Sequence, residues 1–182
     1  GSNVTFGATS LAITYGGLKT VTLTPSTGYY LSSISCTNGY TVTATTGTSA
    51  TAAQTITIKN NSKVTNSTCT ATMAKRSFTV TMSGGNATYS SNSFAVSYAG
   101  TNKVTITPSA GYYLSSISCS NGYTVTGATT GANATGAQTV TINNNSKVAS
   151  STCTVTMAAR SFTVTMAGSN VTFGATSLAV AY

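Results

Sequence analysis

The segment "GYYLSSISCTNGYTV" spans residues 28–42, and "GYYLSSISCSNGYTV" spans residues 111–125. The two copies differ at one position, where the first has Thr37 and the second has Ser120. Each copy contains a cysteine and an Asn-Gly pair, and Asn-Gly is a strong signal for a tight turn next to a strand. A segment of this length that returns almost unchanged indicates a chain built from tandem repeats.

The repeat extends well beyond this segment. Cys36 recurs as Cys119, a shift of 83 residues, and Cys69 recurs as Cys153, a shift of 84. The small change in the shift indicates a one-residue insertion in the loop near Gly127, where an exposed loop tolerates it. The sequence therefore predicts modules of about 83–84 residues.

The module boundaries follow from this shift. The segment "GSNVTFGATSLA" that begins at Gly1 returns at Gly168, two repeats later. We expect a module at 1–76 that lacks its first strand, a complete module at 77–160, and the start of a third module at 161–182. The third piece is interpreted either as part of a longer tandem chain or as a strand that completes a neighbouring module.

Short segments with alternating apolar and polar residues fill each module, as in "SFTVTM" at 77–82 and "QTITIKN" at 54–60. This period of two is typical of half-buried strands, and no segment has helical periodicity. The pattern predicts an all-β fold of tandem small β-sandwich or β-grasp-like modules. The residues expected to face inward are Val21, Leu23, Ile56, Ile58, Ala71, Met73, Phe78, Val80 and Met82.

The junction between modules is short. The segment "MAKR" before the strand at 77–82 has no proline or glycine, so a strand can continue almost unbroken from one module into the next. This favours a linear rod over modules on flexible linkers.

The opening segment has its own expected geometry. Ser32 and Ser33 interrupt the alternation, which predicts a β-bulge. Tyr30, Ile34 and Cys36 are expected to share one face, and Tyr29 and Leu31 are expected to point the other way. The Asn-Gly pair that follows is expected to turn the chain back into a hairpin.

The composition excludes most enzyme chemistry. The 182 residues include no Asp, Glu or His, and 4% are charged against about a quarter in an average protein. Carboxylate pairs, imidazole bases and Ser-His-Asp triads cannot be formed, and no oxygen-rich cage for a hard cation is available. We therefore predict a non-enzyme with no cofactor and no metal.

The net charge of +8 raises the question of nucleic-acid binding. The basic residues are scattered, without the clustering that a nucleic-acid interface needs. No apolar run reaches the roughly 18 residues of a membrane-spanning helix. We expect neither a nucleic-acid partner nor a membrane span. The basic residues are Lys19, Lys59, Lys63, Lys75, Arg76, Lys103, Lys147 and Arg160.

The four cysteines allow three disulfide pairings. The repeat favours pairing within each module, Cys36 with Cys69 and Cys119 with Cys153. A zinc site is a weaker interpretation, because no cysteine has a Cys-x-x-Cys neighbour and histidine is absent. Free buried thiols are the other alternative. Disulfides predict an extracellular or cell-surface location.

The segment "FTVTMSGGNATYSSNSFAVSYAGTNKVTITPSAGYYLSSISC" at 78–119 resembles the bacterial surface-protein repeats of the internalin B-repeat type. The similar features are the opening "FTVT", a glycine-containing turn, the "VTITP" strand and the "GYYL" that follows. The resemblance implies small β-rich modules in tandem on extracellular proteins, with a role in spacing or adhesion. The chain lacks the tryptophan that often follows the Gly-aromatic motif in these repeats.

Two functional hypotheses follow. The first is a structural module of an extracellular filament, pilus-like fibre or adhesin stalk, joined into a linear polymer by self-association or by covalent continuation. The second is an adhesin module that binds carbohydrate or a host surface through Tyr29, Tyr30, Tyr112 and Tyr113, because aromatic faces suit sugars. The repeated Thr-x-Thr pattern also resembles ice-binding faces, although threonine is common on strands.

Asn-x-Ser/Thr motifs mark candidate glycosylation sites in an exported protein. Their number is close to what the composition alone would produce, so the motifs carry no independent weight. The candidates are Asn3, Asn60, Asn66, Asn86, Asn133, Asn144 and Asn170.

Overall fold

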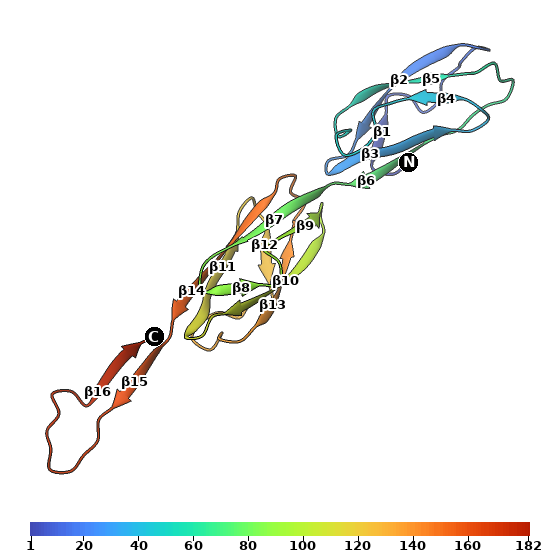
Figure 1. Ribbon diagram of the computed structural model, residues 1–182. Helices are drawn as coiled ribbons and strands as arrows, with labels where there is room; N and C mark the ends of the chain where they lie inside the picture. Colours follow the sequence, from blue (N-terminus) through green and yellow to red (C-terminus); the bar gives the residue numbers. More distant parts are fainter. The chain divides into compact units, whose positions relative to one another are not determined.

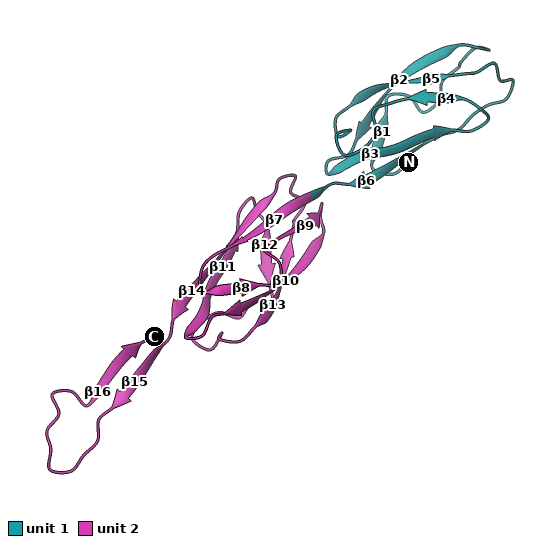
Figure 2. Cartoon of the chain, in the orientation of Figure 1, with its two compact units in different colours: residues 1–77 teal, residues 78–182 magenta.

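The computed structural model describes all 182 residues and divides into two compact units, residues Gly1–Ser77 and Phe78–Tyr182 (Figure 2). Both consist of strands and turns without a helix, which confirms the predicted all-β class (Figure 1). No helix capable of crossing a membrane is therefore found.

The second unit contains a β-sandwich. Its strands are β7 (Ser77–Ser83), β8 (Ala87–Tyr89), β9 (Ser93–Ser97), β10 (Thr101–Pro108), β11 (Tyr112–Cys119), β12 (Thr124–Thr126), β13 (Gln138–Asn143) and β14 (Ser151–Ala159). One four-stranded sheet has the order β12-β13-β10-β8 and the other the order β11-β14-β7-β9. Ile106 and Val140 from the first sheet share one core with Leu114 and Val155 from the second.

Strand β7 shows why the alternating pattern forms a strand of this sandwich. Phe78, Val80 and Met82 are buried, whereas the threonines between them are exposed. Successive side chains of a strand point to opposite faces, so this sequence buries one face and solvates the other. The inward facing predicted for these three residues is confirmed.

The pairing of β7 with β14 differs in direction from the antiparallel pairs of the fold. β7 runs parallel to β14, with Val80 opposite Ser151 and Met82 opposite Cys153. The other paired strands with a recorded register are antiparallel. A parallel pair needs a long crossover connection, and here almost the whole repeat lies between the two strands.

The first unit repeats this plan with fewer strands. Its strands are β1 (Val4–Phe6), β2 (Leu18–Pro25), β3 (Tyr29–Cys36), β4 (Thr41–Thr43), β5 (Gln54–Lys59) and β6 (Cys69–Lys75). The sheet β1-β2-β5-β4 has four strands, as in the second unit, but the other sheet contains only β3 and β6. No residues of the first unit take the place of β7, and residues 10–14, which correspond to β9, do not form a strand.

Strand β3 carries the bulge that the two adjacent serines predict. Its register with β6 shifts between Leu31 and Ser33, and β11 has the same irregularity at the equivalent position. The predicted facing of Leu31 is wrong, because this side chain is fully buried in the core that Ile34 also contacts. The extra residue of the bulge returns Leu31 to the core face.

The turn after β3 changes sheets. Asn38 and Gly39 both have positive φ, 56° and 75°, and the N–H of Tyr40 donates to the carbonyl of Thr37 at 3.3 Å. Two consecutive residues with positive φ are typical of the type I′ turn that Asn-Gly favours. The expected hairpin with β3 is wrong, because β4 pairs with β5 in the opposite sheet.

Residues 161–182 form a two-stranded hairpin of β15 (Ser161–Thr165) and β16 (Ser177–Ala181) within the second unit. These strands pair only with each other, and all their residues are exposed. Phe162, Val164 and Leu178 expose 46%, 47% and 60% of their surface. This hairpin therefore presents apolar side chains to solvent.

Candidate functional site

Each unit has one disulfide between directly opposed residues of neighbouring strands. Cys36 is bonded to Cys69 between β3 and β6, and Cys119 is bonded to Cys153 between β11 and β14. This is the pairing within each module that the repeat favours. No cysteine is left free. Disulfides are typical of proteins outside a reducing cytosol.

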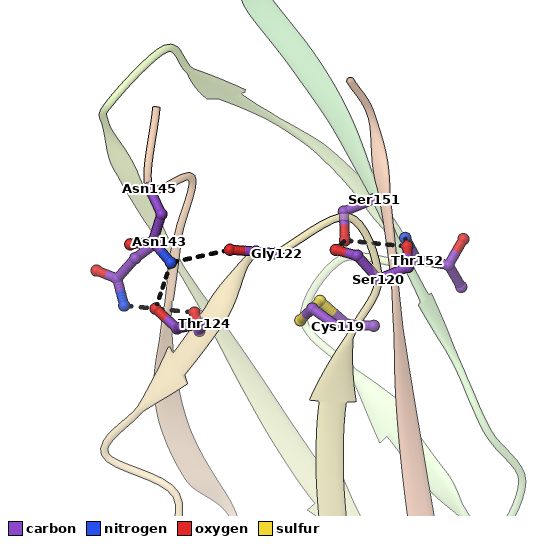
Figure 3. Close-up of a disulfide and its surroundings, with 9 residues drawn as sticks. Cys119, Ser120, Gly122, Thr124, Asn143, Asn145, Ser151 and Thr152 are labelled. Carbon is purple, nitrogen blue, oxygen red and sulfur yellow. Dashed lines mark hydrogen bonds between the residues drawn. A yellow bond between two sulfur atoms is a disulfide. The ribbon is translucent and has the colours of Figure 1, made fainter. Parts of the chain in front are cut away.

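The residue after the first cysteine ties the two strands together further (Figure 3). The N–H of Ser120 donates to the carbonyl of Thr152 at 2.9 Å, and the N–H of Thr152 donates to Ser120 Oγ at 2.9 Å. Thr37 makes both bonds with Thr68 in the first unit, at 3.0 and 2.9 Å. The one difference between the two repeated segments therefore preserves the hydroxyl that these contacts need.

Asparagine side chains hold the turn in place (Figure 3). Asn145 Nδ2 donates to the carbonyl of Gly122 at 3.0 Å and to Thr124 Oγ1 at 3.0 Å. Asn61 makes the corresponding contacts with Gly39 and Thr41 at 2.9 and 3.2 Å. The polar side chains around the disulfide thus satisfy backbone groups of the turn.

A buried polar pair lies close to the same turn in the second unit. Asn144 is fully buried, and its Nδ2 donates to Tyr123 Oη at 2.6 Å. The Tyr123 hydroxyl donates to the carbonyl of Ala149 at 3.0 Å. Burial raises the pKa of Tyr123, and the bond from Asn144 acts in the opposite direction. The sequence analysis did not find this pair, since no periodic pattern distinguishes it.

Two of the candidate glycosylation sites are wrong. Asn60 and Asn144 are buried, at 3% and 0% exposure, and both amide groups are hydrogen bonded inside the fold. A glycan on either nitrogen would have to occupy the core. The remaining candidates are exposed: Asn3, Asn66, Asn86, Asn133 and Asn170.

The tyrosine pairs lie at the beginning of β3 and β11. Tyr29, Tyr30, Tyr112 and Tyr113 are all half-buried. Neighbouring residues of a strand face opposite sides, so the two tyrosines of a pair do not form one flat aromatic surface. The ring of Tyr112 also packs edge-on against Tyr182, with the ring centroids 6.1 Å apart.

The first unit contains a cavity of about 800 Å³ beside β6. Its lining includes the apolar side chains of Leu11, Ile13, Ile34 and Tyr40, and residues 66–69 form one edge. The sequence predicts that this module lacks its first strand, but it predicts neither the cavity nor its lining. We refer to this cavity as the β6 groove.

Equivalent positions in the second unit are covered. Val96, Tyr123, Ser151 and Cys153 are buried there, whereas their counterparts Ile13, Tyr40, Ser67 and Cys69 are half-buried. Most of the covered residues share a core with Val80 and Met82 of β7. The β6 groove thus occupies the place in the first unit that β7 occupies in the second.

No family model, curated protein or solved structure matches this chain. The interpretation of its function therefore depends on the geometry of the two units. That geometry joins the four cysteines into two disulfides and separates the tyrosines of each pair. It also leaves a groove beside β6 in the first unit.

Proposed function

We propose that the chain is a structural module of an extracellular filament or cell-surface stalk, built from tandem disulfide-linked β repeats. The observation that carries the proposal is the continuity of strands between repeats. β6 ends at Lys75 and β7 begins at Ser77, so Arg76 alone separates strands of successive repeats. A one-residue connection has few free dihedral angles, which favours a stiff junction and a linear arrangement.

Other features of the repeats support a load-bearing role. Each repeat has its own disulfide, so each is covalently closed independently of its neighbours. The stability of a tandem array is approximately the sum of its repeats and their nearest-neighbour contacts, which allows many copies to be added. The resemblance to bacterial surface-protein repeats and the two disulfides support the extracellular location.

Small-angle X-ray scattering on chains with two, three and four repeats tests this proposal. We expect the maximum dimension to grow by a constant increment for each added repeat. Insertion of Gly-Gly-Ser-Gly-Gly-Ser after Arg76 is the matched control, because it makes the junction flexible and should lower the radius of gyration. A radius of gyration that the insertion leaves unchanged, or a maximum dimension that does not grow with repeat number, would contradict the proposal.

No observation favours the alternative role of a carbohydrate-binding adhesin module. Its candidate tyrosines are half-buried and lie on opposite faces of their strands. Sugars bind best on open aromatic faces, which these pairs do not form together. Surface glycans therefore remain a weaker proposal for a partner than another copy of the repeat.

A further inference from the structure

We propose that Asn86 is an N-glycosylation site, that its motif recurs with the repeat, and that the attached glycan covers the free edge of β8. Asn86 lies in the turn between β7 and β8, apart from the disulfides, the tyrosine pairs and the β6 groove. The inference goes beyond the proposed function and rests on only one part of it, the extracellular location, because N-glycans are a modification of exported proteins.

The first support is the state of the Asn86 side chain, which is exposed and has no hydrogen-bond partner in the fold. Of the fourteen asparagines, eight use their amide groups in hydrogen bonds, and two of these eight lie in Asn-x-Ser/Thr motifs. Five of the other six lie in such motifs. The fold thus leaves mainly the motif asparagines to solvent. The bonded asparagines are Asn38, Asn60, Asn61, Asn102, Asn121, Asn143, Asn144 and Asn145.

The second support is that the repeat keeps this motif. The triplet "NAT" at 86–88 corresponds to "NVT" at 3–5 and at 170–172. The exposed motifs at Asn66 and Asn133 have no counterpart, because the equivalent positions in the other repeat hold serine. The middle residue of the recurring triplet changes between copies, whereas the asparagine and the threonine that the motif requires do not.

The third support is the geometry of the turn. Asn86 has φ 59°, and its carbonyl accepts a hydrogen bond from the N–H of Ser109 at 2.8 Å. Asparagine tolerates this left-handed conformation, which accounts for its presence in the turn. The conformation does not account for Thr88, which is exposed and whose hydroxyl has no partner. The backbone therefore fixes the turn, and both side chains of the motif stay available.

The location explains what a glycan does there. β8 lies at the edge of the sheet β12-β13-β10-β8 and pairs only with β10. An exposed strand edge is a template for pairing with another chain, and proteins commonly block it with charged side chains or proline. Residues 84–92 contain neither. A hydrated glycan on the residue directly before β8 blocks the edge by its size.

The reaction joins a sugar to the amide nitrogen. Asn86 Nδ2 attacks the anomeric carbon of an oligosaccharide that is carried on a polyprenyl pyrophosphate. The bond from this carbon to the pyrophosphate oxygen breaks, the lipid pyrophosphate leaves, and the amide nitrogen loses one proton. The hydroxyl of the third residue belongs to the acceptor motif that the transferase reads. Asn144 cannot take part in the folded chain, because its Nδ2 is buried and donates to Tyr123.

Peptide mapping of the chain purified from the cells that make it tests the site. Trypsin cleaves after Arg76 and Lys103, so Asn86 is the only motif asparagine in the peptide 77–103. We expect this peptide to carry a glycan, and electron-transfer fragmentation to place the glycan on Asn86. Asn144 is the internal control and should be unmodified. An unmodified peptide 77–103, or a sugar on one of its hydroxyl groups in place of Asn86, would overturn the inference.

Two variants of the full chain, secreted from N-glycosylating cells, test the motif and the role of the glycan. Thr88→Ser keeps the motif and should remain glycosylated. Asn86→Gly removes the acceptor, suits the positive φ and adds no apolar surface, so its urea midpoint should equal that of the natural chain. We expect the Asn86→Gly chain to begin to aggregate, measured by light scattering, at a concentration about threefold or more below that of the glycosylated natural chain.

The same two proteins made in cells without N-glycosylation provide the control, since Asn86→Gly and the natural chain should then aggregate alike. Equal onset of aggregation with and without the glycan would overturn the covering of β8. Failure of this inference is distinguishable from failure of the proposed function. The scattering series on tandem chains measures the increment for each repeat whether or not Asn86 carries a sugar.

Discussion

The two units have closely similar sequences, but the core of the second is larger. It includes five buried residues without a buried counterpart in the core of the first: Val80, Met82, Val96, Tyr123 and Cys153. Two of these belong to β7, one belongs to its neighbour β9, and Cys153 lies opposite β7 on β14. One short strand therefore decides whether side chains from several other segments are buried.

The difference shows that a repeat buries its full core only when the strand equivalent to β7 is part of it. In the first unit the segments that would flank the strand are present, and their side chains stay half-buried around the groove. A small module has a small hydrophobic core, so the absence of one central strand removes a large fraction of its free energy of unfolding.

The largest expected effect concerns β7 itself. Val80 has 0% exposure, and Val80→Lys places a charge in the core of the second unit without a partner. We expect a loss of about 4 kcal/mol or more in the free energy of unfolding of that unit. Urea unfolding followed by far-ultraviolet circular dichroism measures it.

Val164→Lys is the control for this prediction, because Val164 is the equivalent residue and is exposed. It should leave the unfolding of both units unchanged in dilute solution. Equal losses in the free energy of unfolding from the two substitutions would contradict this comparison. They would show that the burial of β7 side chains is not what distinguishes the two units.

The next effect concerns the disulfides. Replacing Cys36 and Cys69 by alanine removes a link between residues 33 positions apart, worth about 3–4 kcal/mol in the loop-closure description. Since the first unit has the smaller core, we expect this variant to lose protection from amide hydrogen exchange throughout that unit. The matching replacement of Cys119 and Cys153 should leave the second unit weakened but folded. If removal of the disulfide weakened the second unit more than the first, the role of β7 in enlarging the core would be contradicted.

A smaller effect concerns alkaline pH. Burial raises the pKa of Tyr89 above its ordinary value, and the equivalent residue in the first unit is Phe6, which cannot ionise. The folded state therefore holds this proton where the unfolded chain has lost it. The contribution of Tyr89 is complete below about pH 10 and is lost as pH rises through the folded pKa.

We expect Tyr89→Phe to reduce the alkaline loss of stability in the second unit, with a difference from the natural chain that is constant below about pH 9. Urea midpoints measured from pH 7 to pH 11 give this difference directly. Lysine ionisation is common to both chains and cancels. A difference that does not change above pH 10 would exclude the contribution of Tyr89.

The smallest effect concerns salt. All charged side chains are positive, with five in residues 1–77 and three in residues 78–182. Their mutual repulsion opposes folding, and added salt screens it. Raising sodium chloride from about 10 mM to about 500 mM should stabilise the first unit by about 0.5 kcal/mol and the second by less. Unfolding midpoints that fall with salt would contradict this prediction.

The sequence was sufficient for most of the strands and for the position of the turn, because each has a local signature. The repeat, rather than a local signature, favoured the disulfide pairing that the structure contains. The alternation in "SFTVTM" shows which side chains turn inward, and Asn38-Gly39 shows where the chain bends. The sequence does not show which strands pair with each other, since every strand has the same backbone hydrogen-bonding groups at its edges. The pairing of β4 with β5 and the parallel pairing of β7 with β14 therefore needed the structure.

The sequence predicts only part of what forms the β6 groove. The repeat phase shows that residues 1–76 lack a strand, but it cannot show that residues 10–14 stay irregular without one. Strand formation there depends on a neighbour that is distant in sequence. The same reason applies to Tyr123 and Asn144, whose contact joins positions 21 residues apart.

The placement of the disulfides has a mechanical consequence. If the two ends of a repeat are pulled apart, the sulfur bridge keeps β4 and β5 out of the stretched path once the other strands have detached. A fully extended repeat of 83 residues would reach about 300 Å, whereas a repeat in which the bridge bypasses the 32 residues between Cys36 and Cys69 would reach about 180 Å. Each repeat would therefore lengthen in one limited step before covalent bonds take up the force.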